Sequence, residues 1–152
     1  MTYSLADLSQ SVFHSLGLPD THDPLALGES PQQRECILLV DGLGMNALEN
    51  YSALPIMNQL KLTRELQSNF PSTTATSLAT LGTGQLPGVH GMLGYTVRVP
   101  RSGEPGRLLN ALRWDERVDP VMWQNVPTLF ERAASSGIKV SHVAAKRYEA
   151  TG

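Results

Sequence analysis

The chain has 152 residues, with 12 lysines and arginines against 14 aspartates and glutamates, so its formal net charge is -2. Apolar residues make up 41% of the chain and charged residues 17%, which is typical of a globular protein and excludes a disordered one. The charge balance also excludes a protein that binds nucleic acid mainly by electrostatics, because no excess of lysine and arginine is present to neutralise phosphates.

The sequence predicts neither a membrane-spanning helix nor an export signal. No apolar stretch approaches the roughly 20 residues that a membrane-spanning helix needs. The N-terminus lacks both the basic start and the continuous apolar run of a secretory signal peptide. A single cysteine, Cys36, excludes an internal disulfide framework. We therefore expect a soluble cytoplasmic protein, with no membrane and no nucleic-acid polymer among its partners.

The first predicted elements are a helix, a loop and a strand. Apolar residues at helical spacing predict a helix that begins near Leu5 and is stopped by Gly17 and Pro19. The segment 18–33 is rich in Pro, Gly, Asp and Ser and is typical of a loop. Residues 35–40 form a short, continuous apolar run, which is typical of a strand in a parallel sheet that is covered on both faces.

Helices and strands alternate along the rest of the chain. Helices are predicted at about 45–51 and 55–66, and strands at 95–99 and 138–144. A further helix at 127–136 has a proline at its start and a glycine just after its end. This order predicts an α/β domain: a mostly parallel sheet with helices on both faces.

The C-terminal half of the chain contains an irregular stretch and ends at a predicted strand. Residues 88–120, rich in glycine, proline and arginine, are expected to be largely irregular. The chain then stops just after the predicted strand 138–144, with no helix to cover that strand. We therefore expect 1–152 to be the N-terminal part of a single, truncated domain, in which 1–34 forms a helix and loop and 35–152 forms part of the α/β core.

Asp41 is the first candidate functional residue. It directly follows the apolar run, at the carboxyl end of a predicted parallel strand, where α/β folds bind ligands. Carboxylates in such a position suit divalent cations. The segment 42–47 also matches the dinucleotide-binding pattern G-x-G-x-x-A, although Asp41 would then bring a negative charge next to a pyrophosphate. A purely structural Asp41, which ends a strand or caps a helix, is another alternative.

Thr74 is the second candidate. Pro71 disfavours a helix before it, Ser72 or Thr73 can cap a helix after it, and Gly84 suits the end of that helix, so Thr74 is expected at or near a helix N-terminus. A helix N-terminus favours phosphate oxygens. A threonine hydroxyl is a poor nucleophile at neutral pH unless a bound metal stabilises its alkoxide. The alternative is that these residues only form the cap and the turn.

Together, the two segments resemble a known family. Residues 37–44 read ILLVDGLG and residues 70–95 read FPSTTATSLATLGTGQLPGVHGMLGY. They are similar to the alkaline phosphatase superfamily and, more narrowly, to its type I phosphodiesterase / nucleotide pyrophosphatase family, and the similarity is clear over residues 35–97. The matching motifs are Asp41-Gly42, the nucleophilic threonine at Thr74, Thr83-Gly84, Pro87 and His90-Gly91. Thr73 is the neighbouring option for the nucleophile.

The resemblance implies an alkaline-phosphatase-like fold and a metal-dependent hydrolase of phosphodiester or nucleotide pyrophosphate bonds. It implies two divalent metal ions, zinc in this family, with Asp41 and the Thr74 oxygen as ligands of one of them. Thr74 would be the nucleophile that forms a phosphothreonine intermediate. The expected partner is a small-molecule phosphodiester or nucleotide, and the oligomeric state is left open.

Two departures from the family pattern affect this interpretation. The family has an asparagine that binds a phosphate oxygen where this chain has Tyr95; we expect Tyr95 to contact the substrate, with simple strand packing as the alternative. The family takes its remaining zinc ligands from later Asp-x-x-x-His and Asp-His patterns, which the four histidines here do not follow, and His90 is expected to make a structural hydrogen bond. We therefore expect this chain to be inactive alone.

Two alternative functions follow from these departures. A phosphomonoesterase or a phosphonate hydrolase of the same superfamily would use the same nucleophile. A non-catalytic half-domain that binds a partner or a nucleotide would explain the missing zinc ligands.

Overall fold

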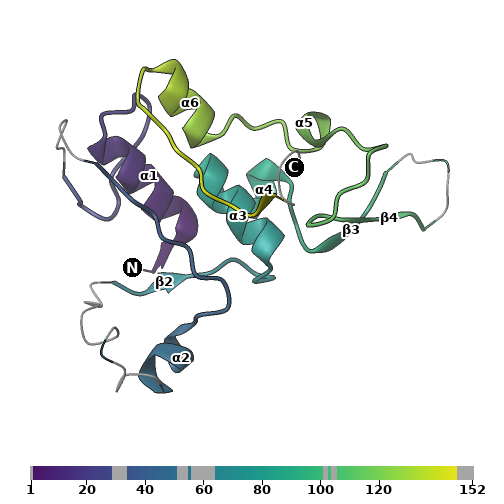
Figure 1. Cartoon of the computed structure of the whole chain (residues 1–152), viewed down its shortest axis with the longest axis horizontal. Helices are drawn as coiled ribbons and strands as arrows, with labels where there is room; N and C mark the ends of the chain where they lie inside the picture. The colour runs from purple at the N-terminus through teal and green to yellow at the C-terminus, as the bar shows by residue number, and fades with distance from the viewer. Residues whose placement is uncertain are drawn as a thin grey trace.

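The computed structural model of the chain describes residues 2–28, 34–50, 55, 64–100, 103 and 106–146. Its elements are drawn in Figure 1. The helices are α1 (Leu5–Ser15), α2 (Met45–Asn50), α3 (Thr74–Thr83), α4 (Pro87–His90), α5 (Pro120–Trp123) and α6 (Leu129–Ser135). The strands are β1 (Tyr3–Ser4), β2 (Leu66–Gln67), β3 (Thr96–Arg98) and β4 (Leu108–Asn110).

Three helices, α1, α3 and α6, pack against one another and form the main body of the described fold (Figure 1). An apolar cluster joins α1 to α6 and consists of Phe13, Leu18, Leu129 and Ala133, with Phe130 and Ile138 packed against it. The rings of Phe13 and Phe130 meet edge to face, with centroids 5.3 Å apart and an interplanar angle of 84°. This is an arrangement that aromatic rings prefer.

Helix α1 begins where its sequence predicts. Ser4 and Asp7 form a capping box: the Asp7 amide donates to the Ser4 hydroxyl at 3.2 Å, and the Ser4 amide donates to the Asp7 carboxylate at 2.7 Å. The helix ends just before Gly17, which has a φ of +79°. The predicted first helix is therefore confirmed, and its buried face carries Val12 and Phe13.

Helix α3 also has the ends that its sequence predicts. The Thr73 hydroxyl accepts a hydrogen bond from the Thr76 amide, and Gly84 adopts the left-handed conformation that ends the helix. The Gln10 side chain of α1 donates a buried hydrogen bond to the Gly84 carbonyl at 3.0 Å. The close approach of α1 to α3 therefore occurs at the glycine that terminates α3.

The sheets are smaller than predicted. Strands β1 and β2 pair in parallel, with Tyr3 opposite Leu66, and strands β3 and β4 pair antiparallel, with Thr96 opposite Asn110. Within the described ranges each sheet has two strands. The chain thus has a small α/β structure, but the predicted mostly parallel sheet with helices on both faces is not formed by these residues. Strand β3 confirms the predicted strand at 95–99.

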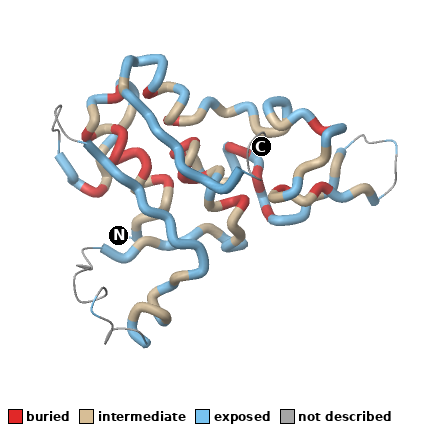
Figure 2. The backbone as a smooth tube through the Cα atoms, in the orientation of Figure 1, coloured by how far each residue is buried: buried red, intermediate tan, exposed pale blue. Residues whose placement is uncertain are grey.

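The predicted strands at 35–40 and 138–144 are wrong for this structure. Neither segment has regular secondary structure, and both are largely exposed (Figure 2): Leu38 is 83% exposed and Val143 is 96% exposed, whereas Ile138 is half-buried. A strand needs a neighbour to pair its backbone N–H and C=O groups. No ladder partner for either segment lies in the described part of the chain, so most of their apolar side chains stay exposed.

Other predictions have mixed outcomes. The helices predicted at 45–51 and 127–136 are confirmed as α2 and α6, and α6 is capped by Thr128. The helix predicted at 55–66 lies mostly outside the described residues. The stretch 88–120 is less irregular than expected, because it contains β4 and the four-residue helix α5 begins at its end. None of the described helices is both long and apolar enough to cross a membrane.

We expect Gly84→Ala to destabilise the fold. A methyl group on Gly84 would lie 2.6 Å from Leu129 Cδ1 and 2.8 Å from Gln10 Nε2, at a φ of +63° that disfavours a side chain. The free energy of unfolding should fall by about 1–3 kcal/mol, as measured by urea denaturation. Gly82→Ala is the matched control in the same helix. Its nearest neighbour would be Thr128 Cγ2 at 3.9 Å, so stability should be unchanged or rise by up to about 1 kcal/mol. Equal stabilities of the two variants would contradict this account.

Candidate functional site

The two candidate residues, Asp41 and Thr74, meet in the structure although they are 33 positions apart. Thr74 Oγ1 donates a hydrogen bond to Asp41 Oδ2 at 2.9 Å. Asp41 lies at the end of the exposed apolar segment, and Thr74 is the first residue of α3. Asp41 is exposed and Thr74 is half-buried, so solvent and a small ligand can reach the pair.

The neighbouring threonine has a different task. Thr73 Oγ1 accepts from the Thr76 amide and lies 2.9 Å from Thr76 Oγ1, while the Thr73 amide donates to the Pro71 carbonyl at 2.9 Å. The hydroxyl of Thr73 therefore serves as the helix cap. The hydroxyl of Thr74 is the one that lies on the carboxylate of Asp41.

The position of Thr74 at the start of α3 also gives it an electrostatic environment. The first amides of any α-helix have no intrahelical acceptor, so those of Thr74 and Ala75 point out of the helix end. With the helix dipole they favour an anion at this end of α3. The pair of Asp41 and Thr74 thus combines a hydroxyl, a proton acceptor and a helix end that suits phosphate oxygens.

His90 makes the structural hydrogen bonds that its sequence context predicts. Its side chain is 2% exposed, its Nδ1 accepts from the Met92 amide at 3.1 Å, and its Nε2 lies 3.0 Å from Thr80 Oγ1. Because an amide can only donate, Nδ1 is the acceptor and the proton is on Nε2. Burial lowers the pKa of His90 and keeps the ring neutral. Both ring nitrogens are therefore occupied.

The described residues do not fit a complete zinc site. They contain no group of three or more His, Cys, Asp or Glu side chains that could hold a metal ion. Every histidine and aspartate of the chain, and its cysteine, lies within the described ranges. Catalytic zinc takes three protein ligands, whereas Asp41 and Thr74 supply one carboxylate and one hydroxyl.

Tyr95, the third candidate, is not joined to the pair by a hydrogen bond among the described residues. It precedes β3, its side chain is 42% exposed, and its carbonyl accepts from the Ala111 amide at 2.9 Å. Among the hydrogen bonds of the described residues, none links Tyr95 to Asp41 or Thr74.

The aspartate that follows β4 also has a structural task. The guanidinium groups of Arg117 and Arg107, 3.1 and 2.6 Å away, hold the pKa of Asp115 well below its usual range. Asp115 therefore joins Arg107, which directly precedes β4, to Arg117 of the β4–α5 connection.

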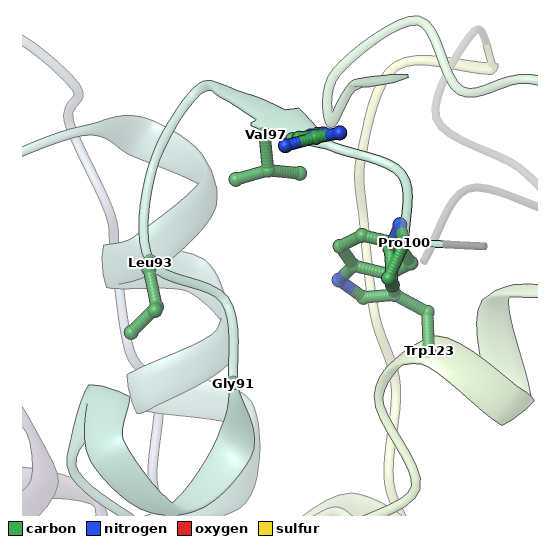
Figure 3. A pocket seen from close by; sticks show the side chains of 6 residues that line it. Gly91, Leu93, Val97, Pro100 and Trp123 are labelled. Atoms are coloured by element: carbon green, nitrogen blue, oxygen red, sulfur yellow. The ribbon is translucent and has the colours of Figure 1, made fainter. Parts of the chain in front are cut away.

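A cavity of about 630 Å³ lies between the α4–β3 connection and α5 (Figure 3). Its lining consists of Gly91, Leu93, Val97, Arg98, Pro100 and Trp123. Trp123 also packs against a cluster of Ala75, Met92 and Ala111. Since Ala75 directly follows Thr74, the cavity and the start of α3 belong to one packing unit.

Comparison with known proteins places these residues in a family. A family model described as "Type I phosphodiesterase / nucleotide pyrophosphatase" matches residues 36–150. The match includes Asp41 and Thr74 and extends well beyond residues 35–97, over which the resemblance is clear from the motifs. Comparison with curated proteins and with solved structures finds no match.

Burial of His90 predicts a pH dependence of stability. The pKa of His90 in the folded chain lies below the usual value of 6.5, so as the pH falls the unfolded chain binds a proton here before the folded chain does. Stability should therefore decrease as the pH falls below about 6.5, with a slope of at most about 1.4 kcal/mol per pH unit from this residue. Urea denaturation at a series of pH values measures the slope of the free energy of unfolding against pH.

The slope should become smaller in His90→Gln and should persist in His22→Gln, which changes an exposed loop histidine. An unchanged slope in His90→Gln would contradict the assignment.

Proposed function

The chain belongs to the type I phosphodiesterase / nucleotide pyrophosphatase family, and we propose that Thr74 is the nucleophile of a site that hydrolyses phosphodiester or nucleotide pyrophosphate bonds. The described residues offer only part of a metal site, so we expect the chain alone to have little activity. The observation that carries this proposal is the hydrogen bond of 2.9 Å from Thr74 Oγ1 to Asp41 Oδ2, at the accessible N-terminus of α3. A hydroxyl next to a proton acceptor is the arrangement that nucleophilic catalysis needs.

The proposed reaction has two steps. In the first, Thr74 Oγ1 bonds to phosphorus as the bond from phosphorus to the leaving oxygen breaks. The hydroxyl proton passes to Asp41 Oδ2 and then to the leaving oxygen, which gives a free alcohol or nucleotide and a phosphothreonine intermediate whose phosphorus still carries the second ester group of the substrate. In the second, water attacks the same phosphorus, the bond from phosphorus to Thr74 Oγ1 breaks, and a phosphomonoester is released as the Thr74 hydroxyl is restored. The amides at the start of α3 would bind the phosphate oxygens in both steps.

Two divalent metal ions, zinc in the family that the sequence resembles, are the proposed cofactors. They would supply positive charge that stabilises the alkoxide and the phosphate oxygens. Asp41 and the Thr74 oxygen are the ligands that the described residues offer for one ion. A carboxylate alone is a weak base for a threonine hydroxyl, so we expect the pair by itself to react slowly.

Tyr95 is the proposed substrate contact. Its exposed phenol precedes β3 and can donate one hydrogen bond. The expected substrate is a small phosphodiester or a nucleotide.

We expect Thr74→Ala to abolish hydrolysis of bis(p-nitrophenyl) phosphate, measured by release of p-nitrophenolate in the presence of added Zn²⁺. The change removes the attacking oxygen, so the rate should fall by about 100-fold or more. Thr74→Ser keeps an attacking oxygen and should retain part of the rate. Ser72→Ala, which changes an exposed residue of the same turn, should leave the rate unchanged. Full activity of Thr74→Ala would exclude Thr74 as the nucleophile.

A further inference from the structure

A network of buried and partly buried hydrogen bonds adjoins the turn 69–73, which directly precedes Thr74. Its centre is the fully buried hydroxyl of Thr80. This hydroxyl accepts from Asn69 Nδ2 at 2.6 Å and from the protonated Nε2 of His90 at 3.0 Å, and it donates to the Thr76 carbonyl at 2.9 Å. A hydroxyl has one proton to donate and two lone pairs, so Thr80 Oγ1 is saturated.

The partners of Thr80 come from three different parts of the chain. Asn69 begins the turn 69–73, Thr76 lies in the first part of α3, and His90 is the last residue of α4. The His90 ring is itself fixed on its other side by the Met92 amide. One hydroxyl in α3 therefore ties the start of the turn to α3 and α4.

Apolar packing contributes little to holding this turn in place. Phe70 is 97% exposed, and Pro71 and Ser72 are exposed as well. The turn is held instead by polar contacts at its two ends, through Asn69 on Thr80 at one end and through the Thr73 cap of α3 at the other. Since Thr74 directly follows the turn, both anchors determine where its hydroxyl lies.

We propose that the side chains of Asn69, Thr80 and His90 are positioning residues, which fix the turn 69–73 and thereby hold the Thr74 hydroxyl on Asp41. None of the three touches the Asp41 carboxylate among the described hydrogen bonds. Their effect on catalysis rests on the proposed function of Thr74. Their effect on the geometry of Thr74 does not rest on it.

The test uses a matched set of threonine variants of the whole chain. Thr80→Val keeps the shape of the side chain but removes the hydroxyl, so Asn69 and His90 lose their shared acceptor. Thr80→Ser keeps the hydroxyl. Thr83→Val is the control: Thr83 is also buried in α3 and its hydroxyl also donates four residues back, to the Ala79 carbonyl at 2.7 Å. Asn69→Ala is a second test variant. It removes only the hydrogen bond that the half-buried Asn69 side chain donates to Thr80.

The first measurement needs no enzyme activity. Three-bond NMR couplings to the methyl group of Thr74, in threonine-labelled protein, report whether its side chain has one rotamer. We expect one rotamer in the wild-type chain, in Thr80→Ser and in Thr83→Val. We expect rotamer averaging in Thr80→Val and in Asn69→Ala, with the rest of the spectrum still dispersed. Wild-type couplings in both Thr80→Val and Asn69→Ala would overturn the proposal.

The second measurement is the rate of bis(p-nitrophenyl) phosphate hydrolysis. A misplaced nucleophile lowers kcat, so we expect Thr80→Val to lose about 10- to 100-fold in kcat with little change in KM. Thr80→Ser should restore kcat, and Thr83→Val should keep it. Wild-type kcat in a folded Thr80→Val would overturn the catalytic part. Hydrolysis that persists unchanged in Thr74→Ala, together with Thr74 couplings that change in Thr80→Val, would refute the proposed function and support the positioning role.

Discussion

The hydrogen bond between Thr74 Oγ1 and Asp41 Oδ2 is the contact on which the candidate site depends. It joins a well-packed part of the structure to a poorly packed one. Thr74 begins α3, which contacts both α1 and α6 and is closed at its ends by Thr73 and Gly84. Asp41 follows an exposed segment without regular structure. Helix α3 therefore fixes the position of Thr74. Whether the hydrogen bond forms depends on where the Asp41 carboxylate lies.

The charges at this helix end explain why a cation matters to the proposed chemistry. The first amides of α3 favour an anion, and Asp41 already brings one there. A phosphate group that approaches Thr74 meets the negative charge of Asp41 within a few ångströms, and like charges at that distance repel. In the proposed reaction, Asp41 therefore has two opposing effects: it accepts the proton of the nucleophile and it repels the substrate. A compensating positive charge would remove the second effect and keep the first.

Local signals predicted α1, α2, α3 and α6 well because each signal acts within a few residues. The capping box of Ser4 and Asp7, the Thr73 cap and the terminal Gly84 need no distant partner. The apolar segments 35–40 and 138–144 do need one, since a strand exists only with a neighbour, and this is why the predicted sheet fails among the described residues. Strand β4 was not predicted, because the glycine, proline and arginine content of the stretch 88–120 indicates irregular structure.

The candidate site was predictable in part. The family motifs singled out Asp41 and Thr74, and the structure brings their oxygens together. The hydrogen-bond network around Thr80 was not predicted, because a threonine within a helix does not by itself indicate a buried network. A signal existed: Thr76, Thr80 and Thr83 follow helical spacing and are all buried, and buried hydroxyls require partners.

The most direct test of the account is to trap the covalent intermediate. Wild-type chain is mixed with a phosphodiester substrate and Zn²⁺, quenched in acid and digested, and the peptides are examined by mass spectrometry. We expect a peptide in which Thr74 carries the phosphate with the remaining ester group of the substrate, and we expect this modification to be absent from Thr74→Ala treated in the same way. Hydrolysis without any such modified peptide, or the modification on another residue such as Thr73, would contradict Thr74 as the nucleophile.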